Sequence, residues 1–276
     1  MSNQIQNTQT TNFTTFQNYY EQAVSAYQSN YARLTYGEFC QRTGRAKRPL
    51  TCANETQFYT AAYAMQHYQS MMTVLDGQIR LANAPLCLNV VDYGCGQGIA
   101  TLALLDFIAK NVGHKVCLNI HLLEPSFVAL HTAKELITAR ADVLGVNVSL
   151  TSQCVEIAGV HLPCHIKTNG YATLHLFSNV LDVVGVQVSL GSVVREIHAM
   201  QGENIVIASA PAYSDSYKGF RQLSALLVGN ANPTIYARTV EHYSYRVIQN
   251  RWQTSTAPSI HMVLSANNDY YNHQVA

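Results

Sequence analysis

Charged residues are scarce in this 276-residue chain: Asp, Glu, Lys and Arg make up 12% of it, about half of the share usual in globular proteins. The formal net charge of +1 excludes a general electrostatic attraction to nucleic acid or to an anionic membrane, although it leaves room for a local basic patch. Hydrophobic residues make up 48% of the chain. The sequence can therefore bury a large core, while Asn, Gln, Ser, Thr and Tyr supply most of its polar surface.

The sequence also lacks the patterns of several other protein classes. No window approaches the roughly 20 apolar residues that span a bilayer, and residues 1–16 do not resemble a secretory signal. The seven cysteines form no C-x-x-C pair, and the eleven histidines form no H-E-x-x-H pattern. No G-x-S-x-G or G-x-x-x-x-G-K-[S/T] motif occurs. We therefore expect a soluble, cytoplasmic protein without a bound metal, and neither a serine hydrolase nor a P-loop NTPase.

Three regions differ in their hydrophobic pattern. Residues 1–12 are rich in Asn, Gln and Thr and predict a disordered tail. Residues 13–84 predict an N-terminal helical cap, because apolar residues recur at helical spacing on both sides of a polar connector at 41–49: Phe13, Phe16, Tyr20, Val24 and Tyr27, then Phe58, Ala62, Met65, Tyr68 and Met72. We expect this cap to pack near the carboxyl edge of a sheet and to contribute to a binding pocket. Residues 85–276 predict a separate α/β domain.

The α/β domain alternates short apolar runs with helical patterns. Strands are expected at 88–91, 116–123, 146–150, 171–177 and 204–209, and helices at 99–110, 126–145, 189–200 and 217–228. Two final strands, possible neighbours in antiparallel order, are expected at 240–252 and 260–266. This alternation predicts a parallel sheet covered by helices on both faces.

The most informative segment is Asp92-Tyr93-Gly94-Cys95-Gly96-Gln97-Gly98, which follows an apolar strand and precedes a helix. It resembles the D-x-G-x-G-x-G motif of class I methyltransferases that use S-adenosylmethionine (SAM). A dinucleotide-binding G-x-G-x-x-G motif would need glycine at Ile99. The resemblance covers about residues 85–210. It implies a Rossmann-like sheet of seven strands, the last one antiparallel, with SAM bound at the glycine loop.

The same resemblance implies further site residues. Glu124, with Pro125 and Ser126, stands where the family has an acid that binds the ribose hydroxyls of SAM. Ser152, Gln153 or Cys154 would lie near the adenine, and Phe177 and Ser178 would line the cofactor pocket. Asn179 and Asp182 are the candidates for contacting the acceptor. The full cofactor set expected is Asp92, Gly94, Cys95, Gly96, Gln97, Gly98, Glu124, Pro125, Ser126, Gln153, Cys154, Phe177 and Ser178.

The sequence thus predicts transfer of a methyl group from SAM to an unidentified small-molecule or protein acceptor. An RNA methyltransferase is a second hypothesis, because Arg42, Arg45, Lys47 and Arg48 form a basic loop that could hold a phosphate backbone. A SAM-binding regulatory protein without turnover is the third. The acceptor, the need for a general base and the oligomeric state stay open.

Overall fold

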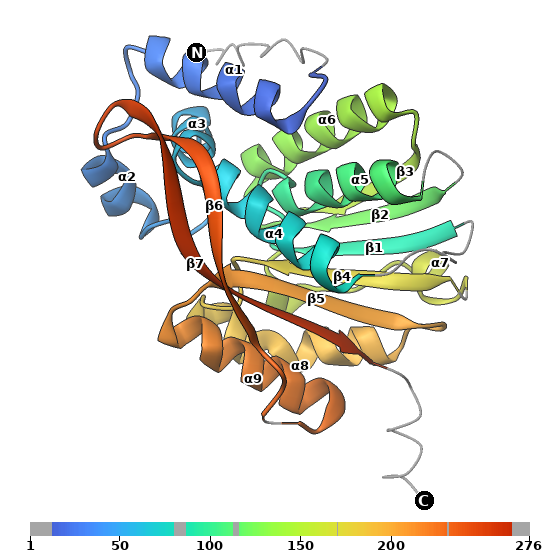
Figure 1. The fold of residues 1–276 in the computed structure, drawn as a ribbon. Coiled ribbons are helices and arrows are strands. Elements are labelled where there is room, and N and C mark those ends of the chain that lie inside the picture. Colours follow the sequence, from blue (N-terminus) through green and yellow to red (C-terminus); the bar gives the residue numbers. More distant parts are fainter. Residues whose placement is uncertain (1–12, 80–86, 113–115, 170, 231, 267–276) are drawn as a thin grey trace, which may run out of the picture.

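The computed structural model describes residues 13–79, 87–112, 116–169, 171–230 and 232–266 (Figure 1). The expected tail at 1–12 and the expected domain boundary at 84 and 85 lie outside these ranges. The strands are β1 (Cys87–Tyr93), β2 (Cys117–Leu123), β3 (Asn147–Gln153), β4 (Ala172–Ser178), β5 (Asn204–Pro211), β6 (Tyr236–Arg246) and β7 (Arg251–Ser265). The helices are α1 (Phe16–Ser29), α2 (Tyr36–Thr43), α3 (Ala53–Tyr59), the π-helix η1 (Thr60–Ala64), α4 (Met65–Gln78), α5 (Ile99–Asn111), α6 (Phe127–Leu144), the 3-10 helix η2 (Ile157–Gly159), α7 (Cys164–Lys167), α8 (Val184–His198) and α9 (Ser214–Val228).

The strands form one seven-stranded sheet in the order β3-β2-β1-β4-β5-β7-β6. β1 to β5 are parallel, and β7 runs antiparallel to both β5 and β6. This confirms the expected sheet with its reversed last strand. From β1 the sheet continues to β2 and β3 on one side and to β4 and β5 on the other. A crevice is therefore expected beyond the carboxyl ends of β1 and β4, where open α/β sheets bind ligands.

The carboxyl-terminal hairpin differs from the sequence prediction. Residues 240–252 were expected to be one strand, but β6 ends at Arg246 and Trp252 already belongs to β7. The chain reverses between them, and Asn250 adopts a φ of 52° there, a left-handed conformation that asparagine tolerates better than most residues. The first part of β7 is polar, so its sequence gave no apolar signal for a strand.

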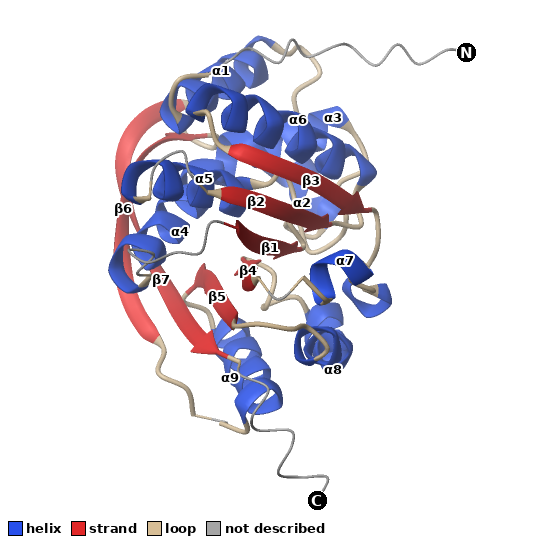
Figure 2. Cartoon of the chain, turned by 90° about the vertical axis from the view of Figure 1, so that its right-hand side faces the viewer, coloured by secondary structure: helices blue, strands red, loops and turns tan. Residues whose placement is uncertain are grey.

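Helices cover both faces of the sheet, and each face has its own core. Leu88 and Val90 of β1 join the core beneath α4, α5 and α6, whereas Val91 and Tyr93 point to the core beneath α8 and α9. Figure 2 shows the two groups of helices on opposite sides of the strands. The helices of residues 13–79 belong to the first core and share its side chains with α5 and α6.

Buried polar contacts join these N-terminal helices to the sheet domain. The Tyr20 hydroxyl accepts the backbone N–H of Tyr245 at 3.1 Å. Arg140 on α6 pairs with Asp106 on α5 at 2.6 Å and donates to the backbone carbonyl of Thr14 at 2.6 Å. The cap and the sheet domain are therefore packed as one body in the described residues. None of the helices described is long and apolar enough to cross a membrane.

Candidate active site

The loop after β1 owes its shape to three glycines in left-handed conformations. Gly94, Gly96 and Gly98 have φ angles of 63°, 53° and 77°. A Cβ on Gly94 would lie 2.7 Å from Val180 Cγ2, and a Cβ on Gly98 would lie 2.9 Å from Ile137 Cδ1. A Cβ on Gly96 would meet no atom within 4 Å. Two of the glycines are therefore needed for packing, while Gly96 presents bare backbone to open space.

Glu124, at the end of β2, is attached to this loop through both of its carboxylate oxygens. Oε2 accepts the backbone N–H of Gly96 at 2.9 Å, and Oε1 accepts that of Ser126 at 2.9 Å. Burial raises the pKa of Glu124, and these two N–H donors partly offset that effect. Each oxygen keeps further lone pairs for a ligand. The carboxylate is thus held in one orientation and lines a cavity beside Gly96.

Asp92, the first residue of the motif, lies beneath the loop. It is fully buried, is absent from the residues that line the cavity, and accepts a hydrogen bond from the Thr101 hydroxyl at 2.7 Å. Burial raises the pKa of Asp92 to about 7, against the opposing effect of Thr101. Asp92 therefore holds the end of β1 against the start of α5 and supports the loop from below.

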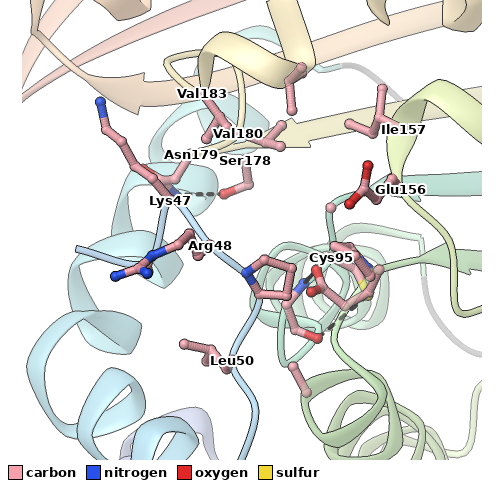
Figure 3. Close-up of a pocket in the computed structure, with 18 of the residues that line it drawn as sticks. Lys47, Arg48, Leu50, Cys95, Glu156, Ile157, Ser178, Asn179, Val180 and Val183 are labelled. Carbon is pink, nitrogen blue, oxygen red and sulfur yellow. Dashed lines mark hydrogen bonds between the residues drawn. The ribbon is translucent and has the colours of Figure 1, made fainter. Parts of the chain in front are cut away.

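A cavity of about 270 Å³ lies above the glycine loop. Its walls come from the ends of β1, β2 and β4, from the loop after β3, from the start of α8, and from the cap. The cap contributes residues 46–50 together with Tyr59 and His67. Figure 3 shows Lys47, Arg48 and Leu50 on one side of the cavity, with Glu156 and Ile157 on the other.

The cap is tied to the sheet domain beside the cavity at two places. The Gln97 side chain accepts a hydrogen bond from the Thr60 hydroxyl at 2.7 Å and donates one to the Thr56 carbonyl at 3.2 Å. The Ser126 hydroxyl donates to the Leu50 carbonyl and also caps α6. Because Gln97 and Ser126 stand on either side of Glu124, the cap helix and residues 46–50 have defined positions above the cavity.

The structure brings about half of the expected residues to the cavity. Those that line it are Gly94, Cys95, Gly96, Gln97, Glu124, Pro125, Ser178 and Asn179. Those that do not are Asp92, Gly98, Ser126, Gln153, Cys154, Phe177 and Asp182. Asn179 has a φ of 56°, and its backbone N–H donates to the Ser209 carbonyl at 2.8 Å, which ties the end of β4 to β5.

Two of the outlying residues have clear structural roles. The Gln153 side chain donates to the His161 carbonyl at 2.8 Å. Phe177 is fully buried and stacks on Tyr93, with ring centroids 4.5 Å apart. Asp182 is half-buried, and its pKa is raised by burial against an opposing effect of Lys47.

The loop after β3 reaches the cavity later than the sequence predicted. β3 keeps pairing with the end of β2, because the Val155 N–H donates to the Glu124 carbonyl at 3.2 Å. Only then does the chain turn, so that Glu156, Ile157 and Ala158 line the cavity in place of Gln153 and Cys154. Sequence reasoning missed His67 and the valines at the start of α8, whose patterns indicate helices but not a site. No group of three His, Cys, Asp or Glu side chains that could hold a metal occurs in the described ranges.

Comparisons with known proteins give matches at the level of structure alone. No family model and no curated protein matches the sequence. A putative methyltransferase from Thermoplasma acidophilum is 15% identical, covers 71% of this chain and 75% of its own, and has a TM-score of 0.38. The O-methyltransferase TomG from Streptomyces achromogenes, solved with SAM, is 11% identical with coverages of 90% and 99% and a TM-score of 0.37. A chain solved in work on thioacetal formation during echinomycin biosynthesis is 12% identical, with coverages of 74% and 84% and a TM-score of 0.41.

The class of fold follows from this chain's own topology. Its sheet order, its single reversed strand and the glycine loop after β1 are those of the class I methyltransferase fold. The chain has the Rossmann-like architecture in which such enzymes bind SAM.

Proposed function

We propose that this protein binds SAM over the glycine loop and transfers its methyl group to a small-molecule acceptor. The observation that carries the proposal is the wall formed by Gly96 and Glu124. Gly96 leaves open space where any side chain would project, and the Glu124 carboxylate is held beside it by two backbone N–H groups. A carboxylate in that position can accept hydrogen bonds from both ribose hydroxyls.

We assign the remaining roles in binding to the other residues around the cavity. Gly94 and Gly98 shape the loop, and Glu156, Ile157 and Ala158 offer a wall for the adenine. Ser178 and Asn179 stand at the end of β4, where we place the methyl-bearing end and the acceptor. When bound, SAM supplies a methyl group on a positively charged sulfur that an acceptor atom can attack in line. The protein contributes alignment and exclusion of water.

The enclosure of the cavity supports a small acceptor over a protein or an RNA. Residues 46–50 cover it, and the basic residues of this segment are already engaged: Lys47 forms an ion pair with Asp215 at 3.8 Å, and Arg48 donates to the Gln41 carbonyl at 2.6 Å. Asp182 lies outside the lining, so we assign it to the support of Lys47 and keep Asn179 as the residue facing the acceptor.

Calorimetry with SAM, S-adenosylhomocysteine and NAD tests the cofactor assignment. We expect micromolar-scale binding of the first two and none of NAD. Incubation with methyl-labelled SAM and fractionated cell extract tests the reaction, with label expected in small metabolites. Label in RNA, lost steeply as salt rises, would replace the proposal with an RNA methyltransferase. SAM binding without label in any fraction would favour a regulatory protein without turnover.

A further inference from the structure

A helical stretch of the cap, α3 to α4, begins beside the carboxyl end of β1 and continues over one face of the sheet (Figure 1). The Thr60 hydroxyl donates a hydrogen bond to the Gln97 side chain beside the end of β1. The hydroxyl oxygens of Ser70 and of Ser209 on β5 lie 2.6 Å apart. β4 lies between β1 and β5 in the sheet. His67 lies between these two anchors in the chain, and it lines the same cavity as Asn179 at the end of β4.

The helix changes its winding just before His67. Residues Thr60–Ala64 form a π-helix, an irregularity that is frequent at functional sites. Across this segment the Tyr59 hydroxyl and His67 Nδ1 lie 3.2 Å apart, although the residues are eight positions apart. The His67 ring also stacks on Tyr63, with an interplanar angle of 11°. The imidazole is therefore held from two sides in one orientation.

Other ionisable groups that line the cavity are less suited to take a proton from the substrate that receives the methyl group. Glu124 already holds two backbone N–H groups, and Glu156 lies across the cavity from Lys47 and Arg48 (Figure 3). Lys47 and Arg48 are basic side chains that already have partners in Asp215 and the Gln41 carbonyl. Burial, with a smaller effect of His242 on β6, lowers the pKa of His67 to about 4. His67 is thus an uncharged imidazole at neutral pH, and one of its ring nitrogens has a lone pair that can accept a hydrogen bond.

We propose that His67 is the proton acceptor for a substrate hydroxyl and that Tyr59 is the positioning residue that orients it. The inference rests on the proposed methyltransferase function and adds the chemical class of its acceptor. In this assignment His67 Nδ1–H donates to the Tyr59 oxygen, which leaves Nε2 to accept. The apolar walls of Pro49, Leu50 and Val180 select a hydroxyl on an apolar body, such as a phenol.

The step balances in atoms and charge. The substrate O–H bond would break as its oxygen forms a bond to the methyl carbon, the methyl–sulfur bond of SAM would break to leave S-adenosylhomocysteine, and the proton would move to His67 Nε2. The positive charge that leaves the sulfur appears on the imidazolium, so the net charge of the site is unchanged. The imidazolium releases its proton to solvent when the ether product departs. A neutral histidine in an enclosed site suits this exchange because no second buried charge is created.

Binding of 4-nitrophenol gives a test that needs no turnover. Its absorbance reports ionisation, and we expect the probe bound with S-adenosylhomocysteine to ionise at a pH lower by about one unit or more in the wild-type protein than in His67→Phe. The phenylalanine keeps a ring against Tyr63 but has no nitrogen. His67→Gln is a second variant should His67→Phe fold poorly. His165→Gln, on α7 at the opposite edge of the sheet, is the matched control and should behave as the wild-type protein.

Methyl transfer to a panel of phenols, primary amines and thiols gives the second test. We expect ethers from the phenols, a loss in kcat of about 100-fold or more in both His67 variants, and a smaller loss for the more acidic phenols. Tyr59→Phe should lower kcat with little change in KM. Unaltered probe ionisation or kcat in the folded variants, failure of every phenol to bind, or products from amines or thiols alone would overturn the proposal. Absent SAM binding in the wild-type protein would instead refute the proposed function.

Discussion

Replacing single glycines of the loop by alanine separates binding from folding. Gly96 and Gly98 share a left-handed φ, so an alanine at either position costs about 1 to 2 kcal/mol in backbone strain. At Gly98 the new Cβ also meets Ile137 Cδ1 at 2.9 Å and Ala133 Cβ at 3.2 Å. Overpacking of this kind adds about 1 to 3 kcal/mol. At Gly96 nothing lies within 4 Å, so the added methyl projects into the space proposed for SAM.

We therefore expect Gly96→Ala to lower the melting temperature by only about 2 to 8 °C while it weakens SAM binding at least about tenfold. Gly98→Ala should lower the melting temperature about twice as much. Gly37→Ala, at an exposed helical position without positive φ, is the control and should leave binding unchanged. Circular dichroism and calorimetry measure the two effects. A folded Gly96→Ala protein with wild-type affinity for SAM would refute the placement of the ligand over this loop.

Three other substitutions test the site and its support. Glu124→Gln should weaken SAM binding about ten- to a hundredfold, since a hydrogen bond to a charged group is worth about 1.5 to 3 kcal/mol, and unchanged affinity by calorimetry would show that another residue binds the ribose. Burial raises the pKa of Asp92 from 3.8 to about 7, so the folded state holds a proton that the unfolded state has released, and stability falls by up to about 4 kcal/mol as the pH rises through that window. Urea unfolding measures this effect: the free energy of unfolding should fall between pH 4 and pH 8 in the wild-type protein and fall less in Asp92→Asn. The same pH dependence in both proteins would contradict this. Arg140→Met should cost about 3 to 5 kcal/mol because it leaves the largely buried Asp106 without its cation and with only the Tyr68 hydroxyl as a hydrogen-bond donor. Arg140→Met with Asp106→Leu should recover part of the loss in the same assay.

The parts of the site that the sequence predicts are those built from neighbouring residues. The loop from Asp92 to Gly98 could be recognised because its glycine spacing is local and follows a strand. Ser126 was expected to begin a helix, and its side chain does cap α6. Even within this segment the sequence did not show which residues line the cavity and which support the loop. Gly98 packs against α6 and Asp92 is buried, whereas Gly96 faces the cavity.

The remainder of the site depends on contacts between distant segments. Ser126 and Leu50 are 76 residues apart, and Gln97 and Thr60 are 37 residues apart. A helical pattern tells which face of the cap is buried, but not which surface covers it. Gln153 lies outside the cavity lining for a related reason, because backbone pairing with β2 continues past the last strand residue and delays the turn toward the cavity.

The two parts of the cap that cover the cavity are held with unequal strength. The helical stretch that carries Tyr59 and His67 is anchored by buried hydrogen bonds at Thr60 and Ser70. Residues 46–50 are joined to the sheet domain by the Ser126 contact and by the ion pair between Lys47 and Asp215, whose side chains are 46% and 56% exposed. An exposed pair of this kind contributes about 0 to 1 kcal/mol. Since exchange of substrate and product requires one wall to open, we expect residues 46–50 to move while the helix that carries His67 stays in place.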